Sequence, residues 1–135
     1  MTKKEISNLS YEIIGAAIEV HCELGPGLLE NVYEKCLVYV LKEKGLDVCS
    51  QIKVPVLFKG KDLALDLRLD ILVNNAIIVE LKSVQNILPV HEAQLLSYLK
   101  LTQKPKGFLF NFNCSNLMKE GQRNFVTNFY ATLPA

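Results

Sequence analysis

Two acidic residues and a lysine on neighbouring predicted strands have the residue types that hydrolytic chemistry needs. Asp70 lies in one segment of alternating apolar residues, and Glu80-Leu81-Lys82 lies in the next. Side chains two positions apart on a strand share a face, so Glu80 and Lys82 lie about 7 Å apart along the backbone. Carboxylates suit the hard cations Mg²⁺ and Mn²⁺, which neutralise a phosphate and generate hydroxide near neutral pH. The pattern therefore indicates metal-dependent phosphodiester hydrolysis.

The same residues have a simpler interpretation. An acidic residue followed at loose spacing by Glu-x-Lys arises often by chance in charged sequences. In that case Glu80 with Lys82, and Asp70 with Arg68, are ion pairs on a solvated strand face. The choice between the two interpretations depends on what other residues accompany the pattern.

Two further groups of polar residues accompany it. Gln94 and Tyr98 are i, i+4 neighbours on one face of a predicted helix, although they also suit an ordinary polar stripe. Residues 27–33 open another helix and place Glu30 and Tyr33 about one turn apart on neighbouring faces. The alternative is purely structural: Gly27 is a turn residue, Glu30 is favourable near a helix N-terminus, and Tyr33 belongs to the core.

Helical spacing dominates the first third of the chain and predicts two helices. The first ends at Gly25-Pro26-Gly27, and the second runs from about Leu28 to a C-terminal Gly45. The predicted buried face of the first comprises Ile13, Ile14, Ala17, Ile18 and Cys22. The predicted buried stripe of the second comprises Leu29, Val32, Tyr33, Cys36, Leu37, Val40 and Leu41.

The spacing then changes to period two, which predicts three strands. Residues 48–58 form the first, and Pro55 indicates an edge position. Residues 63–73 form the second, with one unbroken apolar face, and residues 76–82 form the third after the Asn74-Asn75 turn.

The register of the last two strands follows from their apolar faces. A two-residue loop would put apolar and polar residues opposite each other, whereas a three-residue loop matches them. The matched pairs are Val73 with Ile77, Ile71 with Val79, and Leu69 with Leu81. This register puts Asp70 beside Glu80, and Arg68 beside Lys82, with no appeal to function.

The remaining elements complete an α/β fold. A helix is predicted from about Val90 to Thr102 and a parallel strand at 107–112, followed by a tail that reads as a strand or a helix. The predicted order is α-α-β-β-β-α-β plus one uncertain C-terminal element. With no linker or repeat, residues 1–135 are predicted to be a single domain with a mixed sheet flanked by helices.

Composition limits the partners. Half of the 135 residues are hydrophobic and only 21% are charged, which is typical of a globular chain. A net charge of +1 is low for a protein that binds nucleic acid by general phosphate attraction, so any contact must come from a local patch. The basic candidates are Lys100, Lys104, Lys106 and Arg123, together with Arg68 beside the acidic pair.

The apolar content and the cysteines predict the oligomeric state and the cellular location. A mean hydropathy of +0.19 is high for so short a chain and predicts a homodimer. No apolar run reaches the ~18 residues of a membrane span, and the first residues do not resemble a signal peptide. The cysteines lie far apart, which predicts reduced, mostly buried thiols in a cytoplasmic protein rather than a zinc site. They are Cys22, Cys36, Cys49 and Cys114.

Taken in order, these motifs resemble those of the bacterial and archaeal GxxExxY proteins, which are assigned to the PD-(D/E)XK nuclease superfamily. The matching pieces are Gly27-x-x-Glu30-x-x-Tyr33, Arg68-x-Asp70, Glu80-Leu81-Lys82, Gln94-x-x-x-Tyr98 and a Leu-Phe-Asn-Phe strand. The glutamine–tyrosine helix also resembles that of RecB-type exonucleases. One departure is Leu69-Asp70 where the superfamily name has Pro-Asp.

The resemblance implies a restriction-endonuclease-like core and a role for each residue. Asp70, Glu80 and the Leu81 carbonyl would bind Mg²⁺ or Mn²⁺, and Lys82 would be the catalytic lysine. Glu30 would be the acid that a core helix supplies near the metal, and Gln94 and Tyr98 would orient Lys82 or a substrate phosphate. The implied substrate is nucleic acid, with DNA favoured over RNA.

Two other classes of function stay open at this level. The small size and near-neutral charge favour a non-catalytic module that binds nucleic acid or protein on the same fold. The apolar excess alone favours a purely structural subunit.

Overall fold

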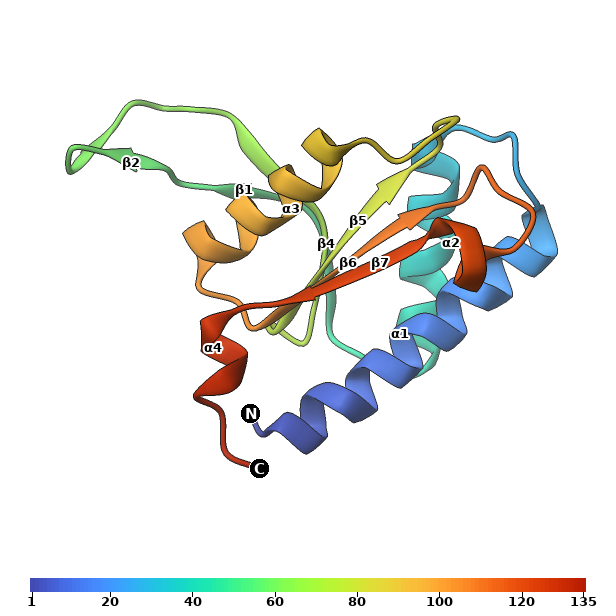
Figure 1. Ribbon diagram of the computed structural model, residues 1–135, viewed down its shortest axis with the longest axis horizontal. Helices are drawn as coiled ribbons and strands as arrows, with labels where there is room; N and C mark the ends of the chain where they lie inside the picture. The colour runs from blue at the N-terminus through green and yellow to red at the C-terminus, as the bar shows by residue number, and fades with distance from the viewer.

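The computed structural model describes residues 1–135 as a five-stranded mixed sheet with helices on both faces (Figure 1). This confirms the predicted α/β fold of the restriction-endonuclease-like type. The strand order is β1-β4-β5-β6-β7, and only β5 and β6 are parallel neighbours. The sheet strands are β1 (Val48–Val54), β4 (Leu67–Val73), β5 (Ile77–Lys82), β6 (Lys106–Asn111) and β7 (Gln122–Val126).

Helices α1 (Lys3–Leu24) and α2 (Glu30–Glu43) cover one face of the sheet, and α3 (Pro89–Thr102) covers the other. The predicted ends are confirmed, because Gly25 and Gly45 follow the two helices with positive φ angles of 68° and 80°. Both are the left-handed conformation that glycine adopts without strain.

The buried faces of these helices differ in part from the prediction. Ile13 and Ala17 are buried, but Ile18 and Cys22 are exposed, because the stripe against the sheet runs through Ile6 and continues to Val20. In α2 the buried stripe is Tyr33, Leu37 and Leu41, at a spacing of four, and Leu29 and Val32 are exposed. Apolar spacing identified the helices, but only packing selected which apolar side chains meet the sheet.

The prediction of mostly buried thiols was wrong. All four cysteines are free, but Cys22 and Cys49 are exposed, and Cys36 and Cys114 are only half-buried.

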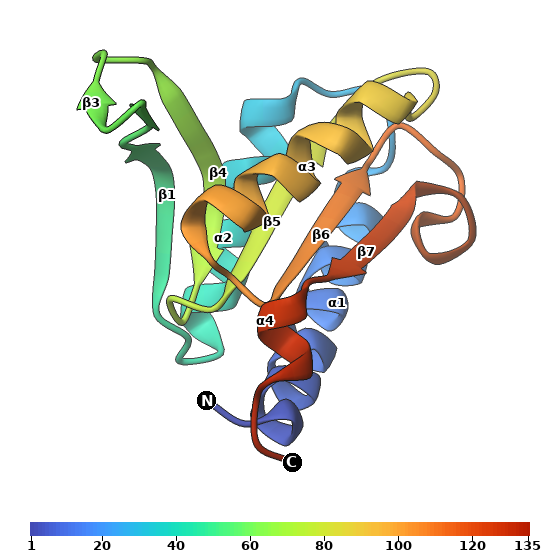
Figure 2. The ribbon, with the colours of Figure 1, turned by 60° about the vertical axis from the view of Figure 1, so that its left-hand side comes forward.

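The region between β1 and β4 also differs from the prediction. The first strand ends at Val54, immediately before Pro55, which lacks the N–H that a strand interior needs. Residues 55–66 then leave the sheet as a projecting arm, with a two-stranded hairpin of β2 (Leu57–Phe58) and β3 (Lys61–Asp62) (Figure 2). The predicted strand over 63–73 begins only at Leu67, because no helix covers Leu63 or Leu65.

The predicted register of the β4–β5 hairpin is confirmed over its paired residues. The partners are Ile71 with Val79, Leu72 with Ile78 and Val73 with Ile77, joined by the three-residue loop 74–76. Both asparagines of the loop have φ angles near 50°, which asparagine tolerates well. The predicted pair Leu69–Leu81 was wrong, because Leu69 packs on the α3 face of the sheet and Leu81 packs on the face that α1 and α2 cover.

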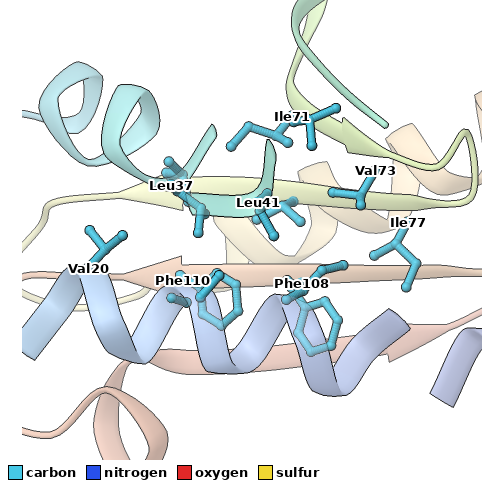
Figure 3. Packing of buried hydrophobic residues seen from close by; sticks show 14 of the residues in the cluster. Val20, Leu37, Leu41, Ile71, Val73, Ile77, Phe108 and Phe110 are labelled. Atoms are coloured by element: carbon cyan, nitrogen blue, oxygen red, sulfur yellow. The ribbon is translucent and has the colours of Figure 1, made fainter. Parts of the chain in front are cut away.

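The second half of the chain has the predicted strand–helix–strand order. Strands β5 and β6 are parallel neighbours in the sheet, and α3 connects them in the sequence. The uncertain tail contains a short π-helix η1 (Leu117–Gly121), then β7 antiparallel to β6, then a short helix α4 (Asn128–Ala131). The larger core lies between the sheet and α1 and α2, where Leu37 and Leu41 meet Ile71 and Phe110 (Figure 3). No helix combines the length and the apolar character that a membrane span requires.

Candidate active site

Asp70 and Glu80 meet where β4 and β5 part. The backbone N–H of Asp70 donates to Glu80 Oε2 at 2.7 Å, and the N–H of Leu81 donates to Asp70 Oδ2 at 2.9 Å. Each carboxylate thus accepts a hydrogen bond from the opposite strand, just past the last paired residues Ile71 and Val79. The two side chains occupy the gap between the strands.

The sheet switches its apolar face at this level. Leu69 packs with α3 on one face, whereas Ile71 packs with α1 and α2 on the other, although a regular strand would put both on one face. The same change occurs in β1, where Val48 packs with α1 and α2 and Ile52 packs with α3. Gln51 lies between them with a φ of +51°. The predicted unbroken apolar face of β4 was therefore wrong, because the packed face changes between Leu69 and Ile71.

Burial and mutual repulsion dominate the electrostatics of the acidic pair. Glu80 is buried, and desolvation followed by the Asp70 carboxylate raises its pKa from 4.5 to about 8. The N–H of Asp70 and the charge of Lys82 act in the opposite direction. The fold therefore favours the protonated form of Glu80 at neutral pH.

Tyr33 positions the start of α2, and with it Glu30. Its hydroxyl donates to the Gly25 carbonyl at 2.6 Å and accepts from the Leu28 N–H at 3.1 Å, and its ring stacks on Phe112. Tyr33 thereby ties the loop before α2 to the core. Glu30, the first residue of α2, accepts a hydrogen bond of 3.4 Å from the Ser83 N–H just after β5.

The segment after β5 is anchored from both sides. Ser83 Oγ donates to the Leu28 carbonyl at 2.6 Å. The buried Asn111 side chain accepts from the Val84 N–H at 3.0 Å and donates to the Val84 carbonyl at 2.9 Å. These bonds keep the end of β5 against the first turn of α2.

A cavity of about 600 Å³ opens between α2 and the parting strands. Its polar lining includes two residues that the sequence did not single out, Glu34 and Gln51. Gln51 Nε2 donates to Glu34 Oε1 at 2.7 Å and lies 3.5 Å from Asp70 Oδ1. Desolvation raises the pKa of Glu34, and the Asp70 and Glu30 carboxylates add to the rise.

Each missed residue left a signal in the sequence. Glu34 follows Glu30 by one helical turn, so it shares the helix face. Gln51 can be assigned to the site only when the β1–β4 register is known. That register places Gln51 opposite Asp70, between the pairs Ser50–Ile71 and Ile52–Leu69.

Asp70 lines this cavity, but Glu80, Lys82, Gln94 and Tyr98 do not. Lys82 is half-buried at the last position of β5. Gln94 Nε2 donates to Tyr98 Oη at 2.8 Å on α3. Burial raises the pKa of Tyr98, the Glu80 charge adds to the rise, and Asp70 makes a smaller contribution.

The basic candidates are scattered over the molecule. Arg68 pairs with Asp66 at 3.1 Å. Lys100 and Lys104 lie at the C-terminal end of α3, and Lys104 Nζ donates to Asn75 in the β4–β5 turn, away from the end of β5. Lys106 begins β6 at that same far end, and Arg123 on β7 lies 3.9 Å from Glu92. The structure does not bring these residues together.

The residues at the site match a hard divalent cation in chemical type. In this conformation no three histidine, cysteine or acidic side chains are arranged around a common metal position. Nevertheless, the donors are two carboxylates, the Leu81 carbonyl and the nearby Glu30, all oxygen ligands. Each inner carboxylate uses one oxygen for its bond to the opposite strand.

Comparison with known proteins agrees with this geometry. The family model described as PD-(D/E)XK nuclease superfamily matches residues 7–125, a span that runs from α1 to β7 and includes every site residue above. Neither curated proteins nor solved structures produced a match. With the family model covering most of the chain and the acidic pair at the parting strands, this protein belongs to the PD-(D/E)XK nuclease superfamily.

Proposed function

We propose that the chain is a nuclease that hydrolyses phosphodiester bonds of nucleic acid with Mg²⁺ or Mn²⁺. Membership of the superfamily indicates nuclease-type phosphodiester hydrolysis, and its nucleases generally use divalent metals. Within the superfamily the motifs resemble the GxxExxY proteins, with DNA as the favoured substrate.

Each residue has a role in this proposal. Asp70, Glu80 and the Leu81 carbonyl hold the metal, with Glu30 beside them at the start of α2. When bound, the ion would polarise the phosphate and activate water. Lys82 contacts the attacking water or the phosphate, and the hydrogen-bonded Gln94 and Tyr98 orient groups around Glu80.

The hydrogen bonds that Asp70 and Glu80 each accept from the backbone of the opposite strand carry the proposal. Two acidic side chains are held side by side, and they accept hydrogen bonds of 2.7 and 2.9 Å from the opposite backbone, which a solvated strand face would not require. Burying an acid such as Glu80 destabilises a fold unless a partner balances its charge. A divalent cation is the partner that these oxygens suit.

One observation favours a second candidate, a binding module that does not cut. The same hydrogen bonds also satisfy the carboxylates without any metal, so a protein that only binds could keep this conformation. Such a module would bind nucleic acid and leave it intact.

A nuclease screen separates the two candidates. Labelled single- and double-stranded DNA and RNA are incubated with the wild-type protein in Mg²⁺, in Mn²⁺ and in EDTA. We expect cleavage in the metal arms and none in EDTA. Binding without cleavage on every substrate would favour the binding module instead.

Metal binding should depend steeply on pH. With a pKa of about 8 in the metal-free protein, Glu80 is mostly protonated at pH 7 and must lose that proton to bind a cation. We expect the apparent Mn²⁺ affinity to weaken by about tenfold for each pH unit below 8, measured by calorimetric titration. An affinity that stays flat between pH 6 and pH 8 would contradict a metal site that includes Glu80.

A further inference from the structure

The projecting arm of residues 55–66 exposes apolar side chains that no other element covers. Leu57 is 65% exposed and Phe58 is 59% exposed, and Leu63 and Leu65 are also open to solvent. At the tip, Lys59 Nζ lies 5.8 Å from the centre of the Phe58 ring. Lys59 and Gly60 both have positive φ, which makes the tight turn of the β2–β3 hairpin. An aromatic ring and lysines are thus presented together at the end of a ribbon.

The arm also carries the positive charge of the chain. Residues 53–68, the arm with its base, contain four basic and two acidic side chains, whereas the rest of the chain contains eleven and twelve. Asp66 is paired with Arg68, which leaves Lys53, Lys59 and Lys61 exposed and free of ion pairs. The remainder of the protein is slightly negative, so this segment is its distinct cationic surface.

The base of the arm adjoins the candidate active site. The arm leaves the sheet at Val54 of β1 and returns to it at Leu67 of β4. Val54 lies three residues from Gln51, and Leu67 lies three residues from Asp70, which is about 10 Å along each strand. In Figure 2 the arm rises from the same end of the sheet as the end of β5 and the first turn of α3. Lys100 and Lys104, by contrast, lie near the opposite end, beside the β4–β5 turn.

We propose that the arm is a nucleic-acid clamp, in which Lys59 and Lys61 contact phosphates and Phe58 stacks on an unpaired base next to the cleaved strand. This inference rests on the proposed function, which requires nucleic acid to bind next to an acidic site. Glu30, Glu34 and Asp70 would repel a polyanion, and the arm supplies exposed cations beside them. Base stacking on an exposed aromatic needs no particular base and adds affinity to the phosphate contacts.

Three variants test the clamp: Phe58→Ala, the double variant Lys59→Ala/Lys61→Ala, and the control Lys4→Ala/Lys42→Ala, which removes equal charge from exposed positions on α1 and α2. Binding of short fluorescent single strands is followed by anisotropy over a range of salt concentrations in EDTA, without cleavage. We expect Phe58→Ala to weaken binding by about 5- to 150-fold. The arm double variant should lower the log–log salt slope by about 1.4, since each lost phosphate contact contributes about 0.7. The control should bind like wild type.

The outcomes separate the clamp from the proposed function. Weaker binding of the arm variants supports the clamp even if no substrate is ever cut, in which case only the nuclease proposal fails. If wild type and arm variants cut and bind alike, or if the control weakens binding as much as the arm variants, the clamp is wrong. It is also overturned if wild type does not bind in EDTA, or if light scattering shows that the arm variants only turn a dimer into a monomer. The last result would make the arm a surface for a second copy.

Discussion

Replacement of Lys82 by alanine should reduce cleavage by about 10²-fold or more while the protein stays folded. Lys82 follows Glu80 by two positions on β5, so it lies on the same strand face, and its charge acts on the Glu80 carboxyl. A cation there stabilises the negative charge that develops on the attacked phosphate, which is where single side chains have effects of this size. The half-buried lysine loses mainly the packing of its stem, so the melting temperature should change little.

The matched control for this variant is Lys42→Ala, which removes an exposed lysine near the C-terminal end of α2. Initial cleavage rates are compared on the same labelled oligonucleotides, with binding measured in parallel. Lys82→Ala should still bind with at most the loss of about one phosphate contact. Equal cleavage by wild type and Lys82→Ala would point to a contaminating nuclease and remove the role of Lys82.

Replacement of Glu80 by glutamine should stabilise the metal-free protein at pH 8. The pKa of Glu80 is 4.5 in the unfolded chain and about 8 in the fold, so the folded state holds the proton more tightly. Its contribution to stability is complete below pH 4.5 and is lost as the pH rises through 8. At pH 8 the cost is on the order of 4 kcal/mol, and a neutral glutamine avoids it while keeping an oxygen for the Asp70 N–H.

The measurement is the melting temperature in EDTA between pH 5 and pH 8. We expect Glu80→Gln to melt on the order of 10 °C above wild type at pH 8, with the difference shrinking toward pH 5. Mn²⁺ should then stabilise wild type but not the variant, because a ligand that prefers the native state raises its stability. Glu19→Gln, at an exposed position on α1, is the control. A variant no more stable than wild type at pH 8 would show that burial of Glu80 is not costly.

The fold and the meeting of the acidic pair could be predicted from local patterns. Gly25 and Gly45 ended their helices as expected because only glycine adopts their backbone angles without strain. The register from Ile71 to Val79 followed from apolar pairing, since a slip by one residue would expose every apolar side chain. That register alone was enough to set Asp70 beside Glu80, as the hydrogen bonds between them now show.

Other features depended on contacts that no local pattern contains. The alternation from Leu63 to Val73 looked like one strand, yet Leu63 and Leu65 lie on an arm and the apolar face switches at Asp70. Alternation reports which side chains are apolar, whereas the layers of helices decide which face they meet. Gln51 reached the site through a neighbouring strand, and the basic residues were distributed by the positions of α3, β7 and the arm. The sequence by itself thus determined the elements and the acidic pair, and only tertiary packing decided what surrounds that pair, because residues far apart in the chain become neighbours through the layers that bury them.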